Sequence, residues 1–201
     1  MSPPQDAELL SPAVLDTSVL FDLYVRDVLL NLALDKRYVV RWSDRILEEL
    51  RRALASRLLD YKIHGTINAM NEEFPRARVE GAHPTPGTPH LPDAHDTHVL
   101  SAAIGCGAPL IVTNNLRDFP EDTLDLVGIK AVSADTFLTW IFRENPTETL
   151  RVVKAQQLDY RRPPFRSLDE FADILESRGL ETFSRALRGQ RTSWRVSPSF
   201  R

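Results

Sequence analysis

Short apolar segments alternate with longer segments of helical periodicity through most of this chain. AVLDTS (13–18), YVVRW (38–42) and PLIVTN (109–114) have the length and apolar content of buried strands, and ARVEGA (77–82) and KAV (130–132) are shorter candidates. Strands that alternate with helices are typical of a parallel sheet with helices on both faces. The pattern therefore predicts an α/β fold, in which polar residues at the carboxyl ends of the strands share one edge of the sheet.

Turn and capping residues set the limits of the expected helices. Ser43 and Ser133 are placed to cap helices, and Gly107 is a natural helix end. The four prolines of HPTPGTPHLP indicate a loop. The helices of this part of the chain are expected over five segments, which are 19–34, 43–59, 60–74, 93–106 and 133–143.

The last part of the chain contains only helix signals. Asn145-Pro146-Thr147-Glu148 combines a cap, a first-turn proline and a capping-box acid. Ser167 begins a second capping box, and Gly179 separates its helix from a last one over about 180–188. We therefore expect four parts, which are a flexible lead (1–12), an α/β domain (13–142), a helical extension (143–188) and a flexible tail (189–201).

Charge is distributed unevenly between these parts. Residues 1–140 contain 13 Lys and Arg against 20 Asp and Glu, whereas residues 141–201 contain 12 against 8. An acidic body with a basic tail needs a functional explanation. The single cysteine, Cys106, cannot form an internal disulfide, no apolar stretch is long enough to span a membrane, and the N-terminus lacks a secretory signal. These features predict a cytoplasmic protein without a membrane partner.

Two carboxylates fall on the apolar face of the helix expected over 93–106. At about 100° per residue, Asp96 lies at the centre of the apolar arc and Asp93 lies within it. The arc is formed by Val99, Leu100, Ala103 and Ile104. Carboxylates on a buried face need partners or a cation. Helix capping explains one such acid more readily than two.

Further polar residues are expected at the same edge of the sheet. Asp16 follows the first strand. On the helix that begins after the second strand, Glu49 lies at the border of the apolar face, whereas Glu48 is expected in solvent. The residues that follow the 109–112 strand are Thr113, Asn115 and Asp118. Acids that converge from separate segments suit Mg²⁺ or Mn²⁺, which can bind a phosphate oxygen and activate water.

Four segments resemble, in order and spacing, the motifs of the PIN-domain nucleases and of the VapC-type toxins of bacterial toxin–antitoxin pairs. They are VLDTSVLFDL, ILEELRRAL, DAHDTHVLSAA and LIVTNNLRDFP. The resemblance covers about residues 13–140 and implies a Rossmann-like α/β/α PIN domain that cleaves RNA with Mg²⁺ or Mn²⁺. It implies catalytic and metal-binding acids, which match Asp16, Glu49, Asp96 and Asp118. A further metal-binding acid, which is found in part of the family, matches Asp93. Thr113, Asn115 and Ser18 match supporting positions, and Asn115 stands where some members have Asp.

The resemblance also implies partners. These are an RNA substrate, for which transfer RNA and ribosomal RNA both stay open, a protein antitoxin and a second copy of the chain in a homodimer. Binding an RNA backbone requires positive charge. The candidate arginines are Arg45, Arg52 and Arg117 near the acids and Arg161, Arg162 and Arg166 in the basic tail. The helical extension resembles a region found on a subset of PIN proteins, and its role stays open.

Three other interpretations stay open. A PIN-like module could bind RNA or protein without cleaving. A phosphoaspartyl hydrolase would also place an Asp after the first strand, although the usual second Asp is replaced by Ser18. A zinc site could use the histidines of 83–98, but the loop is proline-rich, and His95 and His98 are expected to point away from the apolar arc.

Overall fold

A five-stranded, all-parallel sheet forms the centre of the molecule, in the order β3-β2-β1-β4-β5. This is a computed structural model, which describes residues 11–80, 83–160 and 167–189. The strands are β1 (Pro12–Leu15), β2 (Val39–Ser43), β3 (Arg78–Val79), β4 (Leu110–Val112) and β5 (Lys130–Val132). The predicted α/β fold with a parallel sheet is confirmed. Most of the expected lead and tail lies outside the described residues, as do Arg161, Arg162 and Arg166.

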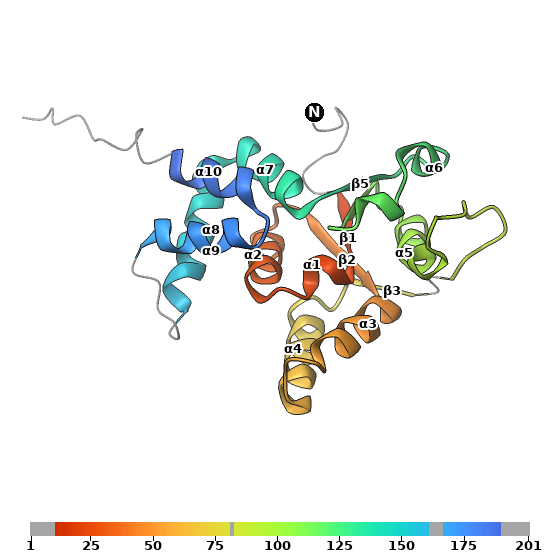
Figure 1. The fold of residues 1–201 in the computed structure, drawn as a ribbon, viewed down its shortest axis with the longest axis horizontal. Coiled ribbons are helices and arrows are strands. Elements are labelled where there is room, and N and C mark those ends of the chain that lie inside the picture. Colours follow the sequence, from red (N-terminus) through yellow and green to blue (C-terminus); the bar gives the residue numbers. More distant parts are fainter. Residues whose placement is uncertain (1–10, 81–82, 161–166, 190–201) are drawn as a thin grey trace, which may run out of the picture.

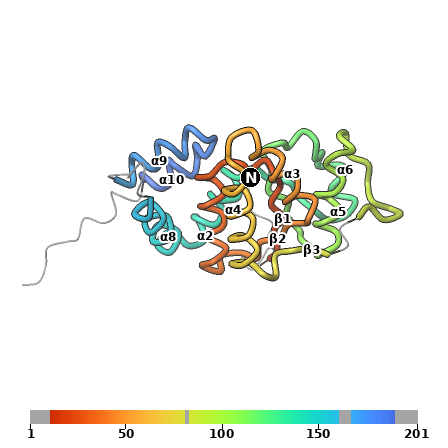
Figure 2. Tube along the Cα trace, turned by 90° about the horizontal axis from the view of Figure 1, so that it is seen from below, coloured from red at the N-terminus to blue at the C-terminus, as the bar shows by residue number. Residues whose placement is uncertain are grey.

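Helices lie on both sides of this sheet. Figure 1 shows α5 on one side and α2 on the other, with α8, α9 and α10 beyond α2, and Figure 2 shows the same order from below. The helices up to the last strand are α1 (Thr17–Leu20), α2 (Leu23–Leu34), α3 (Asp44–Leu54), α4 (Asp60–Glu73), α5 (Thr97–Cys106) and α6 (Glu121–Asp125). Those that follow are α7 (Ala134–Glu144), α8 (Pro146–Asp159), α9 (Leu168–Ser177) and α10 (Glu181–Gly189), and the 3₁₀ turns are η1 (Ala94–Asp96) and η2 (Leu116–Asp118). No described helix is both long and apolar enough to cross a membrane.

The predicted caps are present where the chain turns from strand to helix. The Ser43 hydroxyl accepts the Ile46 N–H at 3.3 Å, and the Ser133 hydroxyl accepts the Thr136 N–H at 3.1 Å. Gly107 ends α5 with φ 65°, in the left-handed region that a residue without Cβ adopts readily. These local signals therefore place α3, α5 and α7 correctly relative to the strands.

Two predicted helices are shorter than expected. The segment 19–34 is split into α1 and α2, because the Asp22 carboxylate accepts the backbone N–H groups of Tyr24 and Val25 and starts a new helix. The helix after Ser43 was expected to run to residue 59 but ends at Leu54, and Leu58 beyond its end is exposed. The split separates a short helix at the end of β1 from the long helix that covers the sheet.

The helical extension shares a hydrophobic core with the sheet. Phe171 and Phe183 are fully buried and belong to the same cluster of apolar side chains as Val14 and Leu15 of the central strand. The α7 helix runs to Glu144, across the expected limit at residue 142. That limit stays a prediction.

Candidate functional site

Asp16 lies where the carboxyl ends of β1 and β4 meet. Its backbone N–H donates to Val112 O at 3.0 Å, and the residue is only 6% exposed. Its carboxylate does not cap α1, although the residue stands at the N-cap position. Instead, Oδ2 accepts hydrogen bonds from the hydroxyls of Ser18 at 2.6 Å and Thr113 at 2.7 Å. Both hydroxyls were predicted as supporting groups.

Backbone amides orient these two hydroxyls. The Asn114 N–H donates to Ser18 Oγ at 2.9 Å, and the Asn115 N–H donates to Thr113 Oγ1 at 3.0 Å. A hydroxyl that accepts from an amide can direct its own proton to the carboxylate. The loop after β4 is thereby fastened to α1 and holds Asp16 in place.

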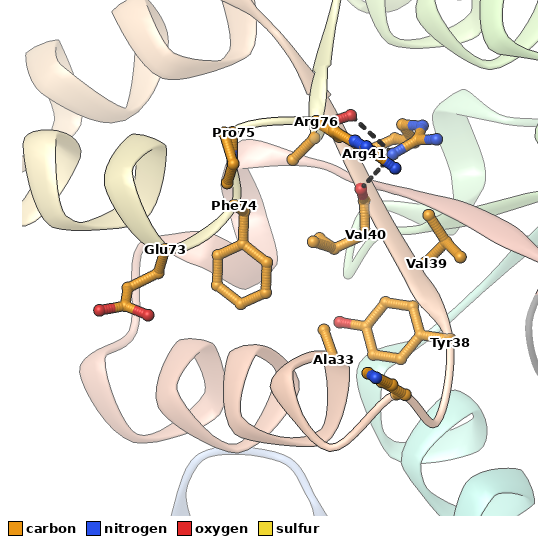
Figure 3. Close-up of a pocket in the computed structure, with 11 residues that line it drawn as sticks. Ala33, Tyr38, Val39, Val40, Arg41, Glu73, Phe74, Pro75 and Arg76 are labelled. Atoms are coloured by element: carbon orange, nitrogen blue, oxygen red, sulfur yellow. Dashed lines mark hydrogen bonds between the residues drawn. The ribbon is translucent and has the colours of Figure 1, made fainter.

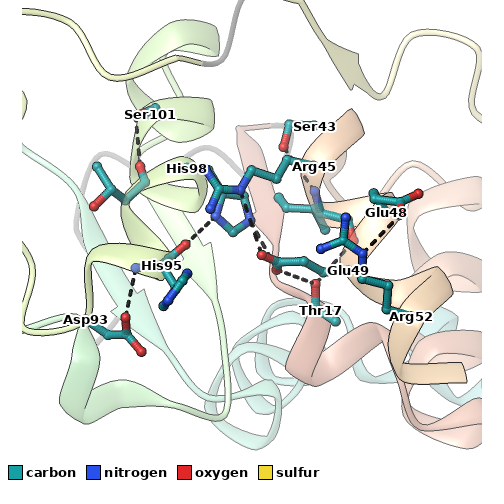
Figure 4. A network of polar contacts seen from close by, with 12 residues as sticks. Thr17, Ser43, Arg45, Glu48, Glu49, Arg52, Asp93, His95, His98 and Ser101 are labelled. Carbon is teal, nitrogen blue, oxygen red and sulfur yellow. Dashed lines mark hydrogen bonds and ion pairs between the residues drawn. The ribbon is translucent and has the colours of Figure 1, made fainter. Parts of the chain in front are cut away.

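Glu49 lies on α3, across from α1 and α5 (Figure 4). Its Oε2 accepts a hydrogen bond from Thr17 Oγ1 at 3.3 Å and lies 3.2 Å from His98 Nε2. Arg45 Nε lies 3.9 Å from Oε1. Three different helices therefore contribute to the position of this carboxylate. Glu48 is exposed, as expected.

His98 is almost completely buried, at 1% exposed. Its Nδ1 lies 2.6 Å from the His95 carbonyl oxygen, which can only accept, so Nδ1 carries a proton. Nε2 is close to Glu49 but lacks the alignment of a hydrogen bond. The expectation that His95 and His98 point away from the apolar face is wrong for His98, and the two rings do not share a surface because His95 is exposed.

Asp96 is surrounded by other acids. Burial is the main cause that raises the pKa of Asp96 to about 6, and negative charges on neighbouring carboxylates raise it further. These neighbours are Asp16, Asp93, Asp118 and Glu49. Asp96 Oδ2 is buried and has no hydrogen-bond partner among the described residues. The four other acids predicted from the sequence therefore all act on Asp96 through their charges, and we call the five together the acidic cluster.

The helical wheel misplaces the start of α5. Residues 94–96 form a 3₁₀ turn with three residues per turn, so the α-helical angles do not apply to Asp93. Asp93 is exposed and accepts the His95 N–H at 2.8 Å. Ile104, which was expected on the buried face, is 37% exposed. Asp93 is close enough to raise the pKa of Asp96, but it lies at the border of the acidic cluster.

The residues after β4 form a chain of polar contacts. The Asn115 side-chain amide donates to Asp118 Oδ2, and Arg117 Nε donates to Asn115 Oδ1 at 3.4 Å. Asn115 therefore links Asp118 to a positive charge. Among the other candidate arginines, Arg52 contacts Glu48 at 3.2 Å instead of Glu49. Of this group, Arg45 and Arg117 contact residues named as site candidates.

Sequence reasoning missed three residues that hold the candidate acids. Thr17 contacts Glu49, His98 lies beside it, and Asn114 donates to Ser18. Thr17 directly follows Asp16, and His98 lies two residues after Asp96 within a run of buried residues, so proximity to the motif acids was the available signal.

The donors of the acidic cluster are of the kind that Mg²⁺ and Mn²⁺ prefer, since they are carboxylate oxygens. Asp96 Oδ2 has no hydrogen-bond partner among the described residues, and no basic residue is among the groups that shift the Asp96 pKa. Both observations are consistent with a cation bound beside Asp96. In the described part of the chain, no three His, Cys, Asp or Glu side chains already stand together as a formed metal site. The cluster thus has suitable chemistry, without a preformed coordination shell.

Comparisons with known proteins agree with the motif resemblance and with the fold. The sequence model of the PIN domain matches residues 12–117, and that of the VapC50 C-terminal domain matches residues 134–189. The chain is similar to a protein of Mycobacterium tuberculosis (strain ATCC 25618 / H37Rv) named "Putative ribonuclease VapC50", with 40% identity over 70 residues. The matched segment covers 35% of this chain and 41% of that protein. No solved structure matches the chain.

Proposed function

This chain belongs to the PIN-domain family, and on that premise we propose that it is a metal-dependent endoribonuclease that hydrolyses RNA phosphodiester bonds at the acidic cluster. The observation that carries the proposal is the environment of Asp96. Its buried carboxylate oxygen lacks a partner among the described residues, and the residues that shift its pKa are all acids. Such an arrangement is unfavourable unless a cation or a proton relieves it.

The residues of the cluster would share the work of holding a divalent ion. Asp16, Glu49, Asp96 and Asp118 are the proposed ligands, directly or through water, and Asp93 is the outermost acid. A bound Mg²⁺ or Mn²⁺ would polarise the scissile phosphate and lower the pKa of an attacking water. Carboxylates that keep several waters on the ion suit this chemistry.

The surrounding groups keep two of the acids oriented. Ser18 and Thr113 both donate to Oδ2 of Asp16, so the described contacts leave Oδ1 for a ligand. Thr17 donates a hydrogen bond to Oε2 of Glu49, and His98 Nε2 lies 3.2 Å from the same oxygen. Groups held in this way need little reorganisation when substrate binds.

A protein antitoxin and an RNA substrate are the proposed partners. The support is the resemblance of the four motifs to VapC-type toxins together with the similarity to a protein named as a ribonuclease. The acidic cluster itself repels RNA, so substrate binding also requires cationic groups outside it. Arg45 and Arg117 are the described candidates nearest to the acids.

The test is cleavage by the purified chain and by its Asp16→Asn variant. We expect Mg²⁺- or Mn²⁺-dependent cleavage of a panel of structured RNAs, with 5′-phosphate product ends, and its loss in the variant and in EDTA. Asp125→Asn, at an exposed carboxylate that is not among the acids acting on Asp96, is the matched control and should cleave like the wild type. Undiminished cleavage by folded Asp16→Asn would contradict the proposal, and binding without cleavage by the wild type would favour a non-cutting module.

A further inference from the structure

A cavity of about 600 Å³ lies at the opposite end of α1 from Asp16. Its wall includes Phe21, which directly follows α1, and Leu54, the last residue of α3. The α4 helix contributes Lys62, and the extension contributes Arg178, which directly follows α9. A volume of this size is within the range of small-molecule sites and can hold a nucleotide.

The cavity is lined by more positive than negative charge. Its cations are Arg26, Arg57, Lys62 and Arg178, and its carboxylate is Asp22. Arg178 Nε lies 3.5 Å from Asp22, and the buried Arg26 donates to Leu20 O at 2.9 Å. Within the described residues, neither Arg57 nor Lys62 makes an ion pair with a carboxylate. The net charge left for a ligand is therefore positive.

Aromatic rings hold two of these cations. The Arg57 guanidinium lies 4.3 Å from the centroid of the Phe21 ring, and that of Arg178 lies 6.0 Å from the centroid of Tyr24. Single-stranded nucleic acids are bound by this combination, since bases stack on guanidinium planes and aromatic faces while cations contact phosphates. The Arg57 side chain is already layered on Phe21 and would present its other face to a base.

The cavity is also close to the acidic cluster. From Asp16 to Phe21 the chain advances five residues, which is about 8 Å along a helix, and from Glu49 to Leu54 it advances five residues of α3. The Thr17–Glu49 hydrogen bond ties these two helices together. One RNA strand could therefore contact both the cavity and the cluster.

We propose that this cavity binds one nucleotide of single-stranded RNA beside the scissile phosphate, with its base stacked on Arg57 and its phosphate contacting Lys62 and Arg178. The inference rests on the proposed ribonuclease function and gives the helical extension a part in it. Because the extension supplies Arg178, it would contribute directly to the binding of substrate.

A second cavity, of about 360 Å³, provides a contrast (Figure 3). It lies between the end of α2, the start of β2 and the segment after α4, and borders none of the five candidate acids. Arg41 at its wall is engaged by the carbonyl oxygens of Val40 at 3.3 Å and Arg76 at 2.7 Å. Lys36 is an exposed cation on the wall of this second cavity, so it is a suitable site for a control substitution.

The test measures binding of a fluorescein-labelled 12-nucleotide single-stranded RNA on the Asp16→Asn background with Mg²⁺. Lys62→Glu should weaken binding about tenfold and lower the slope of log affinity against log salt by about 0.7 for each phosphate that the protein no longer binds. Lys36→Glu makes the same charge change at the other cavity and should bind like the parent. Arg57→Lys keeps the charge, so it should weaken binding about fivefold through weaker stacking and leave the salt slope unchanged.

Gly65 allows a test that changes no charge. It lines the cavity on α4, and a Cβ placed there meets no other atom within 4 Å. We expect Gly65→Phe to fill the cavity and weaken RNA binding about tenfold or more, whereas Gly65→Ala should bind normally. Unchanged affinity in Lys62→Glu and Gly65→Phe would overturn the inference and leave the cavity to a protein partner. Since cleavage by the chain with Asp16 intact is measured separately, that result is distinct from a failure of the proposed function.

Discussion

Two regions of this molecule contain a half-buried carboxylate, and the neighbours of these two carboxylates differ. In the acidic cluster, Asp96 is surrounded by other acids. At the interface between α2 and the extension, Asp27 accepts the Tyr160 hydroxyl at 2.7 Å and lies 3.8 Å from Arg26. Burial raises the pKa of both carboxyls, but at Asp27 the hydrogen bond from Tyr160 and the charge of Arg26 act in the opposite direction.

The difference separates a structural acid from a candidate functional acid. The Asp27 carboxylate is paired by the chain itself, through Tyr160 and Arg26, and Gln156 donates in turn to the Tyr160 hydroxyl at 3.1 Å. The acidic cluster retains a buried oxygen without a partner in the described part of the chain, together with unbalanced negative charge. The first arrangement stabilises the contact between the two parts of the chain, whereas the second becomes favourable when a cation is added.

Exchanging one carboxylate in each region should separate activity from stability. Glu49→Gln, which removes a proposed metal ligand, should lower the single-turnover cleavage rate at least about 100-fold and change the unfolding midpoint little. Asp27→Ala should keep the cleavage rate at saturating RNA and lower the free energy of unfolding, because it leaves the Tyr160 hydroxyl and the buried Arg26 without this partner. If the two variants lost activity equally, the distinction between the regions would be wrong.

Removing a ring from the interface should have the largest effect on stability. Phe171 is fully buried and packs against Tyr24 and Tyr160, with ring centroids 6.4 and 5.6 Å away. Phe171→Ala should lower the free energy of unfolding by about 3–5 kcal/mol, measured by urea denaturation. Leu158→Ala, at a residue of the extension that is 74% exposed, should stay within about 0.5 kcal/mol of the wild type.

The acidic cluster should show its charge imbalance as a pH dependence. The folded metal-free chain binds the Asp96 proton with a pKa of about 6, against an ordinary value of 3.8, so its stability falls as the pH rises from about 4 to about 6. Asp96→Asn should therefore raise the melting temperature in EDTA at pH 7, and the gain should vanish near pH 4.

Addition of Mg²⁺ should reverse this order by stabilising the wild type more than Asp96→Asn. Asp122→Asn, at an exposed carboxylate, serves as the control for a general loss of negative charge. If Asp96→Asn were less stable than the wild type in EDTA at pH 7, the neighbouring acids would not oppose ionisation of the Asp96 carboxyl in the wild type.

The smallest expected effect is the loss of one hydrogen bond at the interface. Tyr160→Phe removes the hydroxyl that donates to Asp27, and it should lower the free energy of unfolding by about 1–3 kcal/mol with little change in the cleavage rate. Thermal or urea unfolding together with the RNA cleavage assay checks this. A tenfold loss of cleavage rate would instead couple the extension to the acidic cluster.

Much of the fold and most of the acidic cluster were predictable from local sequence. Apolar strands that alternate with capped helices specify a parallel sheet, and parallel strands bring their carboxyl ends to one edge, so the sequence alone predicts that Asp16 and Asp118 lie close together. Ser43, Gly107 and Ser133 marked helix limits because capping depends on a few neighbouring backbone groups. These features depend on interactions within a few residues or on strand order.

Contacts between distant segments were decided only by the tertiary structure. His98 reaches Glu49, and Arg178 reaches Asp22, because packing brings together helices that lie far apart in the chain. The 3₁₀ turn before α5 changed the direction of Asp93 in a way that an α-helical wheel cannot describe. The sequence by itself therefore determined which acids gather at the sheet edge. Which of them are held, which stay unpaired and how the extension joins them depended on side-chain packing, which has no local signature.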